Sequence, residues 1–546
     1  MKRRLANAKT RKETGFDYVV AGVNVLTPFG QKRIKETPPF FPGEEGLLKA
    51  EFGKLDKALA FVKSDPKSTD ALSRILMEIK DVSGTITRAA KDPLSVVELF
   101  EIKSLLLKMD AMADLFSRAP FAMPEDFVPV APKALLRRLD PRNDKMDAFY
   151  LYDEFSEALT AARKRKRETE NTIRAARKKQ KEIIAQRHGL ALTPKFERVI
   201  SKANAEELQQ ARAIPELVSV DEDYTSVTFA IKDTEDIDRL RAEADAAAAI
   251  IEEEELAVRE VLSGEIAQHE KALLESCARI GAWDVAAAKA AYALAHRCVI
   301  PEIAAEHALA ITKGRHLQVE DALRAKDTAY CPVDLTLAAG VTCLTGANMG
   351  GKTVSLKLIG LISLLTQNAF FVPCEKAAVG LSAHIQLLIG DDQSLDRGLS
   401  GFGSEMETLR DMLDNSGDRS LLLIDEMASD TNPAEGSALT KAVMAYLKGK
   451  PYISVLTTHF DVCGEEEVTG GMKNMQVVGL AGVDFDKLNK ELRYAGKRER
   501  IQIIAKHMDY RLREAAACEE VPRDALNIAK MLGIDGAIIE NAKKYL

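Results

Sequence analysis

A glycine-rich segment in the C-terminal half carries the strongest chemical signal of the chain. Residues 346–353 read Gly-Ala-Asn-Met-Gly-Gly-Lys-Thr, which fits the pattern G-x-x-x-x-G-K-[ST]. The glycines let backbone N–H groups surround a phosphate, Lys352 can reach the β- and γ-phosphates, and Thr353 can ligate Mg²⁺. An apolar run precedes the segment and another follows it, so a strand and a helix are expected beside it. We expect nucleotide phosphates to be bound by Gly346, Ala347, Asn348, Met349, Gly350, Gly351, Lys352 and Thr353.

Two acidic residues follow a second apolar run. The run 421–424 ends in Asp425 and Glu426, so a buried strand would deliver two carboxylates to its C-terminal edge. Asp425 would hold Mg²⁺, directly or through water, and Glu426 would orient and deprotonate an attacking water. Alone, this pattern is as typical of an ordinary strand end as of a site. Its position about seventy residues after a phosphate loop favours a site.

A histidine follows the next strand-like run. His459 comes after Thr457 and Thr458, directly beyond the apolar residues 454–456. A lone histidine is more often structural than catalytic. At the end of the strand that follows the acidic strand, however, the position favours a histidine that senses a γ-phosphate.

The elements that position these residues are short buried strands alternating with helices. The apolar runs 341–344, 421–424 and 454–456 have strand length, and they predict a parallel α/β sheet within residues 301–546. The preceding part is helical in pattern from about residue 51 onward, with loops marked by Asp-Pro pairs. The first 50 residues hold turn signals around short apolar pieces.

Two long helices are expected between these parts, roughly over 146–188 and 234–275, because apolar residues recur there every three or four positions. Between them, residues 218–231 alternate apolar and polar around an Asp-Glu-Asp turn, which predicts a β-hairpin. Basic runs at 163–167 and 177–179 could contact phosphates. The interpretation we favour is a solvated helix face that is balanced by an acidic return helix.

Composition restricts the class of protein. The chain has 546 residues with 76 Lys and Arg against 83 Asp and Glu, a formal net charge of −7. Its seven cysteines form no CxxC pair, which favours reduced thiols over disulfides or a zinc site. No apolar run approaches the length of a membrane span, and the basic N-terminus precedes no signal-like stretch. We expect a cytoplasmic protein with no membrane partner.

Together, these segments resemble the ATPase head of the MutS family within the ABC-type ATPases. The Asn-Met of the phosphate loop resembles that family more specifically than a general phosphate loop does, and residues 389–394 and 399–406 resemble its signature segment. Residues 431–439 resemble the T-D-P-x-E-G-x-A-L of the bacterial branch that lacks a mismatch-recognition domain. The tail 528–546 resembles the closing helical segment of the family.

The resemblance implies a fold, a cofactor set and a dimer. The expected fold is an α/β C-terminal P-loop ATPase head, preceded by a mostly α-helical core with long lever helices and a small β clamp tip. ATP and Mg²⁺ would be bound between two heads of a dimer, with Ser400 of one subunit approaching the γ-phosphate on the other. Glu426, His459 and Ser400 would be catalytic, and Thr353 and Asp425 would hold the metal. The implied ranges are an N-terminal segment 1–50, a helical core 51–300 with the tip at about 189–233, an ATPase domain 301–520 and a dimerisation segment 521–546.

The sequence departs from the family pattern in the parts that would contact a DNA target. Fifty residues before the helices cannot hold a mismatch-recognition domain, and the tip segment 189–236 has five Lys and Arg against ten Asp and Glu. Such a tip should repel a duplex. Ala428 and Asp430 also replace glycines of the family. These replacements are expected to affect the rate of ATP turnover and not the binding of ATP.

Two functions remain open. The first is a DNA-acting ATPase that clamps double-stranded, mismatched or branched DNA, as the family implies. The second is an ATP-driven protein remodeller with DNA binding lost, because some MutS-like proteins are partners of adenosylcobalamin-dependent aminomutases. A transporter subunit or an SMC-type head is excluded by the order of the motifs, since both nucleotide motifs lie after the helices.

Overall fold

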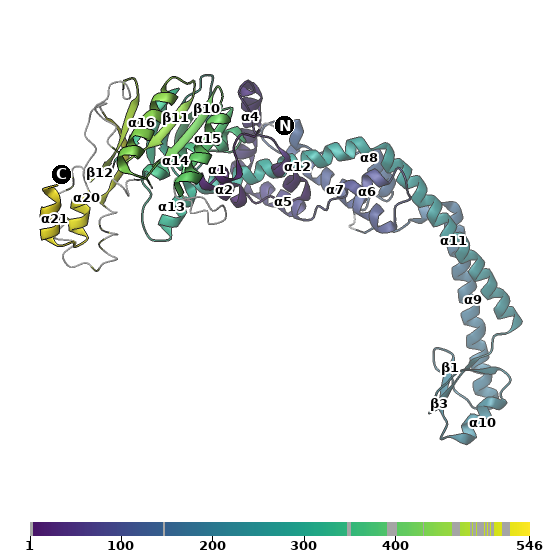
Figure 1. Ribbon diagram of the computed structural model, residues 1–546. Coiled ribbons are helices and arrows are strands. Elements are labelled where there is room, and N and C mark those ends of the chain that lie inside the picture. Colours follow the sequence, from purple (N-terminus) through teal and green to yellow (C-terminus); the bar gives the residue numbers. More distant parts are fainter. Residues whose placement is uncertain are drawn as a thin grey trace. The chain divides into compact units, whose positions relative to one another are not determined.

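The computed structural model divides the chain into two compact units (Figure 1). The first unit comprises Met1–Glu78, Leu115–Val128 and Arg279–Leu546, and the second comprises Ile79–Asp114 and Pro129–Ala278. The residues that the structure describes are 4–145, 148–346, 351–389, 401–429, 431–460, 470–480, 508–515 and 525–545, with the single residues 483, 488, 496, 500, 503 and 507. The mixed α/β composition expected from the sequence is confirmed.

A six-stranded sheet forms the centre of the first unit. Its order is β13-β12-β7-β11-β10-β9, with parallel pairing from β12 to β9 and antiparallel pairing of β13. The three apolar runs predicted as parallel strands are β7, β10 and β11, and they are neighbours in the sheet. The bounds are β7 Gly340–Thr345, β9 His384–Ile389, β10 Ser420–Asp425, β11 Ile453–Thr457, β12 Lys473–Gly479 and β13 Asp509–Ala515.

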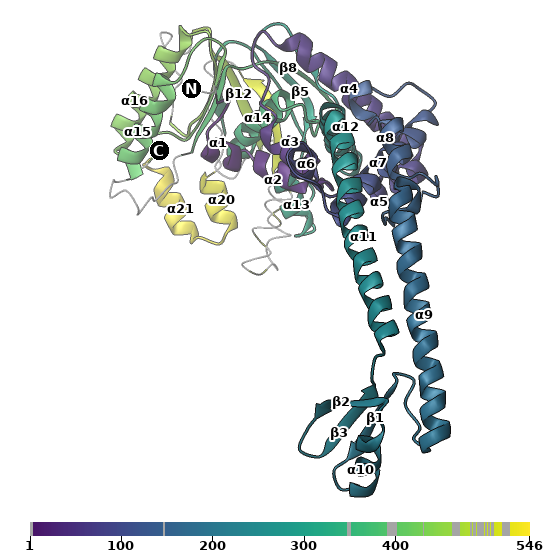
Figure 2. The ribbon, with the colours of Figure 1, turned by 90° about the vertical axis from the view of Figure 1, so that its right-hand side faces the viewer.

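Helices cover both faces of this sheet because its strands are buried on both sides (Figure 2). On one face, Leu422 and Ile424 of β10 pack with residues of α15 (Gly401–Asp414) and α16 (Pro433–Lys448). On the other face, Gly360 of α14 (Lys352–Gln367) lies so close to Leu423 that an added Cβ would be 3.1 Å from its side chain. Successive residues of β10 therefore hold helices on opposite faces.

A smaller four-stranded sheet belongs to the same unit, in the order β4-β8-β5-β6. Its elements are β4 Glu302–Ala304, β5 Leu309–Gly314, β6 Val333–Leu337 and β8 Lys376–Gly380, with α13 (Leu317–Arg324) between β5 and β6.

The N-terminal segment, expected as short pieces between turns, is helical and covers the edge of the large sheet. Its helices are α1 Ala8–Glu13, α2 Phe16–Gly22 and α3 Pro28–Glu36. The backbone N–H of Ile385 in β9 donates to Leu5 O at 2.8 Å, and that of Leu387 donates to Thr10 Oγ1 at 3.2 Å. Glu13 pairs with Lys357 of α14 at 3.0 Å. The segment therefore satisfies donors of the edge strand and contacts the helix that follows the phosphate loop.

Helix α12 (Glu270–His296) holds the apolar centre of the helical part of this unit. Trp283 makes edge-on contacts with Phe61, Phe116 and Phe127, with ring centroids 4.9 to 5.8 Å apart. Six residues further along α12, the ammonium of buried Lys289 donates to Ala369 O at 2.8 Å and lies 3.9 Å from the centre of the Phe370 ring. The elements beside it in this unit are α4 Glu45–Ser64, α5 Pro66–Met77, the 3-10 turn η1 Glu125–Phe127 and the last residues of α7 (Val96–Ser117), most of which belongs to the second unit.

The second unit contains the two long helices, α9 (Glu157–His188) and α11 (Glu235–Gln268), side by side (Figure 2). The predicted start of the first helix at 146 is wrong, because α9 begins after Ser156, whose hydroxyl accepts from Leu159 N at 3.1 Å. Upstream of it, buried Lys103 donates to Ala148 O at 3.1 Å and to Tyr152 Oη at 3.2 Å, which holds that segment out of the helix. The second predicted helix is divided at His269, where α11 ends and α12 begins. The unit also contains α6 Ser83–Arg88, α8 Lys133–Leu139 and the turn η2 Asp153–Phe155.

Between these helices lies a three-stranded sheet in the order β1-β3-β2, which we call the tip sheet. The predicted hairpin is confirmed as β2 (Leu217–Glu222) and β3 (Ser226–Ile231), whereas β1 (Glu197–Ser201) and α10 (Ala205–Ala213) were not predicted. Asp223 shapes the turn by accepting from Thr225 N at 2.6 Å and from Ser226 N at 2.7 Å. These hydrogen bonds favour the carboxylate and lower the pKa of Asp223 to about 2.

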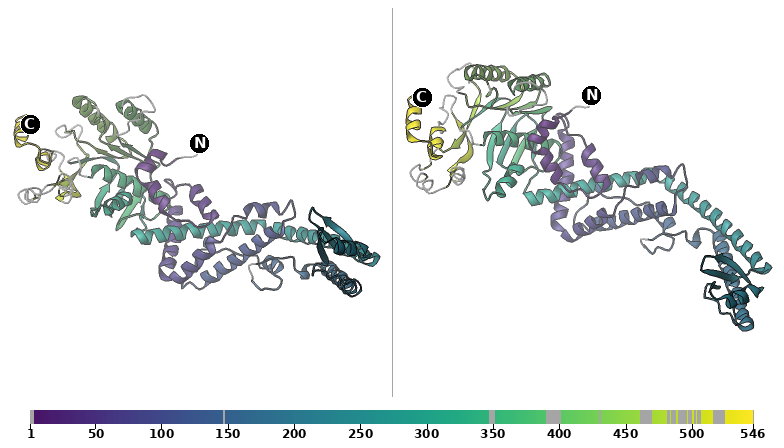
Figure 3. Two further views of the ribbon diagram at one scale, coloured as in Figure 1. Left: turned by 90° about the horizontal axis from the view of Figure 1, so that it is seen from below. Right: turned by 60° about the horizontal axis from the view of Figure 1, so that its bottom comes forward.

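The C-terminal part ends in α20 (Ala525–Met531) and α21 (Gly536–Lys543), which lie next to each other (Figure 3). Among the helices that the structure describes, none has the length and apolarity needed to cross a membrane.

Candidate functional site

The phosphate loop joins β7 to α14 at the carboxyl edge of the large sheet. Gly346 ends the strand with φ +131° and Gly351 precedes the helix with φ +82°, both in the region that favours glycine. A Cβ at Gly346 would be 3.1 Å from Val477, so the neighbouring strand β12 also requires a glycine there. Ala347, Asn348, Met349 and Gly350 lie outside the described residues.

Lys352 is the first residue of α14, and its side chain is buried with 4% exposed. Its ammonium donates to Gly346 O at 2.8 Å and pairs with Glu426 Oε1 at 3.0 Å. The cation of the loop is thus held between the two ends of the site, the glycine at the end of β7 and the acid at the end of β10. A buried ammonium needs such partners because its desolvation is costly.

Thr353 and Asp425, the two residues expected to hold a metal, contact each other. The Thr353 hydroxyl donates to Asp425 Oδ2 at 2.7 Å. The other carboxylate oxygen, Oδ1, accepts from the hydroxyl of Thr457 at 2.6 Å. Asp425 is 6% exposed, and its orientation is fixed from two directions, by the phosphate-loop helix and by the end of β11.

Glu426 begins a strained turn. Its φ is +44° and that of Ala428 is +59°, a conformation that costs side-chain-bearing residues about 1–2 kcal/mol each. Two hydrogen bonds support the turn. Glu426 N donates to Thr457 Oγ1 at 2.9 Å, and Ala428 N donates to the carboxylate of Glu405 at 3.1 Å. The turn leaves the Glu426 side chain 31% exposed, within reach of solvent.

Of the other two predicted site residues, the structure describes His459. It lies two residues beyond Thr457 with an exposed ring, whose centre is 4.3 Å from that of Phe460. It shares the strand end with the site but is not one of the partners of Lys352 and Glu426 given above. Ser400 lies outside the described residues, and α15 begins at the next position, Gly401.

Two supporting residues were missed from the sequence. Thr457 connects Asp425 to the backbone of Glu426, and Glu405, 7% exposed on α15, holds the turn after it. Thr457 had a signal, since it follows the strand next to the acidic one. Glu405 lies 23 residues before its partner Ala428, and no local pattern indicates that contact.

These residues fit a nucleotide with a magnesium ion. Mg²⁺ is commonly held by one or two protein oxygens together with phosphate oxygens, and the Thr353 hydroxyl and Asp425 carboxylate offer such a pair. Within the described ranges, no group of three or more His, Cys, Asp or Glu is arranged to hold a metal by itself. A metal at this edge would therefore depend on the phosphates for its remaining ligands.

Comparison with known proteins finds similarities to one family. Residues 342–546 match the family MutS domain V. Three relatives, each named Endonuclease MutS2, are similar to the chain. The protein of Acetivibrio thermocellus is 32% identical over 288 residues, 52% of this chain and 32% of the relative. That of Shouchella clausii is 31% identical over 285 residues, again 52% and 32%. That of Caldanaerobacter subterraneus subsp. tengcongensis is 26% identical over 535 residues, 92% and 61%.

What the chain shares with the MutS family is thus the match of residues 342–546 to its domain V and these partial similarities to MutS2 proteins. The match to the first two relatives covers about a third of their length, and the longest match covers about three fifths.

Proposed function

We propose that this chain is a MutS-type ATPase that hydrolyses ATP to ADP and phosphate in a head-to-head dimer and moves a clamp engaged with double-stranded DNA, mismatched or branched. The observation that carries the ATPase part is the convergence of Lys352, Thr353, Asp425 and Glu426 at one sheet edge, from two segments more than seventy residues apart.

The proposed roles follow from the atoms that these residues present. Lys352 exchanges its contact with Glu426 for the β- and γ-phosphate oxygens, which frees the carboxylate to act as a base. Glu426 then orients a water and accepts its proton as the water attacks the γ-phosphorus. Thr353 and Asp425 hold Mg²⁺, which when bound would neutralise the charge that develops on the phosphates.

Residues 346–351 would supply backbone N–H groups to the phosphates, and the N-terminus of α14 would add its dipole. We propose that His459 turns toward the γ-phosphate and that Ser400 of a second subunit completes the site. The exposure of His459 supports this, because a bound nucleotide could reach its ring. The start of α15 at Gly401 would place a helix N-terminus beside Ser400.

DNA as the target is supported by the family and by the relatives named as endonucleases. The second candidate is an ATP-dependent remodeller or reactivating factor of a protein such as an adenosylcobalamin-dependent aminomutase. One observation favours it, the acidity of the tip segment, with ten acids against five bases in residues 189–236. A tip of this sign should not attract a phosphate backbone.

Lys352→Ala tests the nucleotide site. We expect loss of ATP binding, measured with a fluorescent ATP analogue, because the buried cation that meets the phosphates is removed. Lys49→Ala, a change at an exposed position of α4, is the control and should bind as the wild type does. Tight nucleotide binding by Lys352→Ala would overturn the assignment of the phosphate loop.

The target is tested by capture with a protein that binds but does not hydrolyse ATP. Glu426→Gln serves this purpose, because the amide keeps the shape of the side chain but cannot accept the proton. Duplex DNA recovered with it at physiological salt and lost at higher salt would support the first candidate. A stoichiometric enzyme recovered without DNA would support the second.

A further inference from the structure

The outer face of α9 carries an ordered row of cations. Lys164, Arg167, Arg174 and Lys178 are spaced three, seven and four residues apart, so they lie on one face of the helix over about 21 Å. All four side chains are exposed. The buried residues of α9, among them Leu159 and Ala162, lie on another side of the helix. We call these four residues the α9 row.

The cations of the α9 row are distinguished by their lack of strong partners. Among the described residues, Arg167, Arg174 and Lys178 have no ion-pair partner, and Lys164 reaches Glu168 only at 4.0 Å with both side chains about two-thirds exposed. An exposed pair of that length contributes little. The row is therefore available to an external anion.

Several other cations of the same helix are paired. Arg163 contacts Asp153 and Glu255 at 2.8 Å each, and Arg177 contacts Asp233 at 2.6 Å. Asp153 precedes α9, Glu255 lies on α11 and Asp233 lies just before α11. The cations of the α9 row differ from these in having no strong ion pair.

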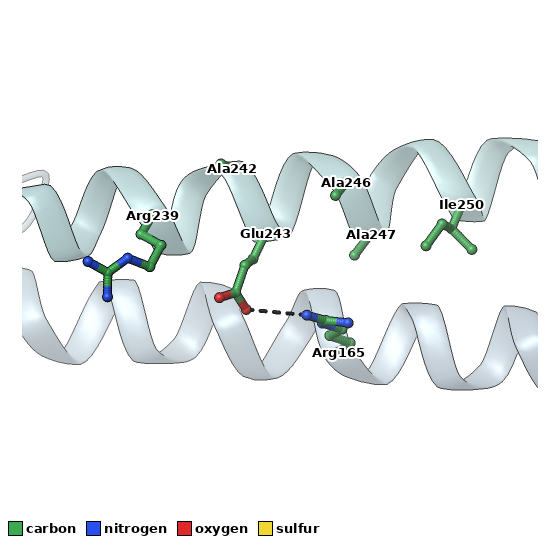
Figure 4. A pocket seen from close by; sticks show the side chains of 7 residues that line it. All are labelled: Arg165, Arg239, Ala242, Glu243, Ala246, Ala247 and Ile250. Atoms are coloured by element: carbon green, nitrogen blue, oxygen red, sulfur yellow. Dashed lines mark ion pairs between the residues drawn. The ribbon is translucent and has the colours of Figure 1, made fainter.

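A groove of about 280 Å³ lies between α9 and α11 and is lined by charged side chains of its own (Figure 4). Arg165 lines it and pairs with Glu243 across the groove at 3.6 Å, as the dashed line in Figure 4 marks. The rest of its lining is largely alanine, with Arg239 and Ile250. Arg239 pairs with Asp236, outside this lining, at 3.8 Å, so the groove offers one weakly paired cation whereas the α9 row offers four.

The chemistry of the row fits phosphates better than a protein surface. No large apolar side chain of α9 is exposed, whereas protein interfaces depend on buried apolar and aromatic anchors. The tip sheet has the opposite character, with exposed Val199, Val218, Val220 and Tyr224 and an excess of acids. Overall, α9 has 11 Lys and Arg against 4 Glu, whereas α11 has 3 Arg against 11 Asp and Glu.

We propose that the α9 row is a sequence-independent binding site for the phosphate backbone of duplex DNA, and that the duplex is held by the shaft of α9 rather than by the tip sheet. This inference rests on the DNA-acting function proposed above and gives it a location. Four cations that each neutralise one phosphate release counterions, so they make binding steeply dependent on salt.

The test measures binding of the full chain to a labelled 40-base-pair duplex by fluorescence anisotropy across 50–200 mM KCl. Lys164→Gln/Lys178→Gln removes two cations of the row. Its matched control is Lys49→Gln/Lys63→Gln, two exposed lysines of α4 that are also 14 residues apart. The row variant should bind at least about tenfold more weakly at 100 mM salt, and its slope of log K against log salt should be flatter by about 1.8.

Adding Arg167→Gln and Arg174→Gln should raise the total flattening to about 3.6, while the control keeps the wild-type slope. Circular dichroism and basal ATPase activity should be unchanged, because none of these residues touches the nucleotide site. Equal binding by the row and control variants would overturn the inference while leaving the DNA function intact. Wild-type protein that hydrolyses ATP but binds no duplex would overturn both. Tighter row-dependent binding of polyglutamate than of duplex would assign the row to an acidic protein instead.

Discussion

Lys352 and Lys289 in the first unit carry the same ammonium group as Lys164 and Lys178 in the second, in opposite surroundings. The first two are buried and fully engaged, Lys352 with Gly346 and Glu426 and Lys289 with the carbonyls that follow α14. The other two lie exposed along α9. The buried cations therefore determine local geometry, whereas the exposed cations are free to meet a ligand.

This difference predicts which substitutions change stability and which change only binding. Removing a partner from a buried charge leaves an unsatisfied group and costs several kcal/mol, whereas removing an exposed cation scarcely changes stability. Changes around the nucleotide site should thus alter turnover and folding, and changes on α9 should alter only binding.

Glu426→Gln should have the largest effect. Loss of the proposed base should lower the rate of ATP hydrolysis about 10²–10⁴-fold, since this is the usual contribution of a general base, while ATP binding persists. Phosphate release under single-turnover conditions measures the step. Hydrolysis at the wild-type rate would remove Glu426 from the chemistry.

Lys289→Met tests the comparison through the pH dependence of the unfolding free energy. Burial lowers the pKa of Lys289 to about 7, whereas in the unfolded chain it is near 10.4. Between these values the unfolded chain holds one more proton at this site, so the wild-type fold should gain up to about 1.4 kcal/mol of unfolding free energy per pH unit from this residue. Below pH 7 both states are protonated and the contribution is constant.

The measurement is urea unfolding at pH 7.5, 8.5 and 9.5. Lys289→Met should lose this rise, and Lys164→Met, which removes an exposed lysine, should keep it. A rise of the same size in both variants would show that Lys289 is not its source.

Thr457→Val probes the connection between the two acids. The change removes a donor to Asp425 and an acceptor for Glu426 N in a buried place, so we expect a loss of about 2 kcal/mol in unfolding free energy. Weaker Mg²⁺ dependence of nucleotide binding should accompany it. Thr457→Ser keeps the hydroxyl and should retain most of the stability. If the valine variant unfolds like the wild type, the hydroxyl is not needed to hold the site.

Ala428→Gly should have the smallest effect and the opposite sign. A glycine relieves the cost of φ +59° but gains entropy in the unfolded chain, which leaves a net stabilisation of about 0.5–1 kcal/mol. Thermal unfolding measures it, with Ala434→Gly near the start of α16 as a control that should destabilise. A less stable Ala428→Gly protein would show that the turn is not strained.

The sequence was informative where strand runs end in residues with chemical roles. Residues 341–344, 421–424 and 454–456 form adjacent strands, and Lys352, Thr353, Asp425 and Glu426 meet at their edge. Each run is apolar on both faces and is followed at once by polar residues, which is how parallel strands of a covered sheet are patterned.

The elements that could not be predicted from the sequence depend on contacts between residues far apart in the chain. The helices α1 to α3 are too short to be stable alone, and they form because residues such as Thr10 bond to β9 more than 370 positions away. The start of α9 was misplaced because a buried Lys103, on another helix, holds the preceding segment. Neither signal is local, so periodicity could not reveal it.

The N-terminal segment has a consequence for how the protein behaves outside its folded state. Leu5 and Thr10 occupy hydrogen-bond donors along β9, the outermost strand on that side of the large sheet. If this cover is detached, an apolar strand with open backbone donors becomes a template for pairing with other chains. A protease cut in the first residues should therefore lead to aggregation before it leads to loss of nucleotide binding.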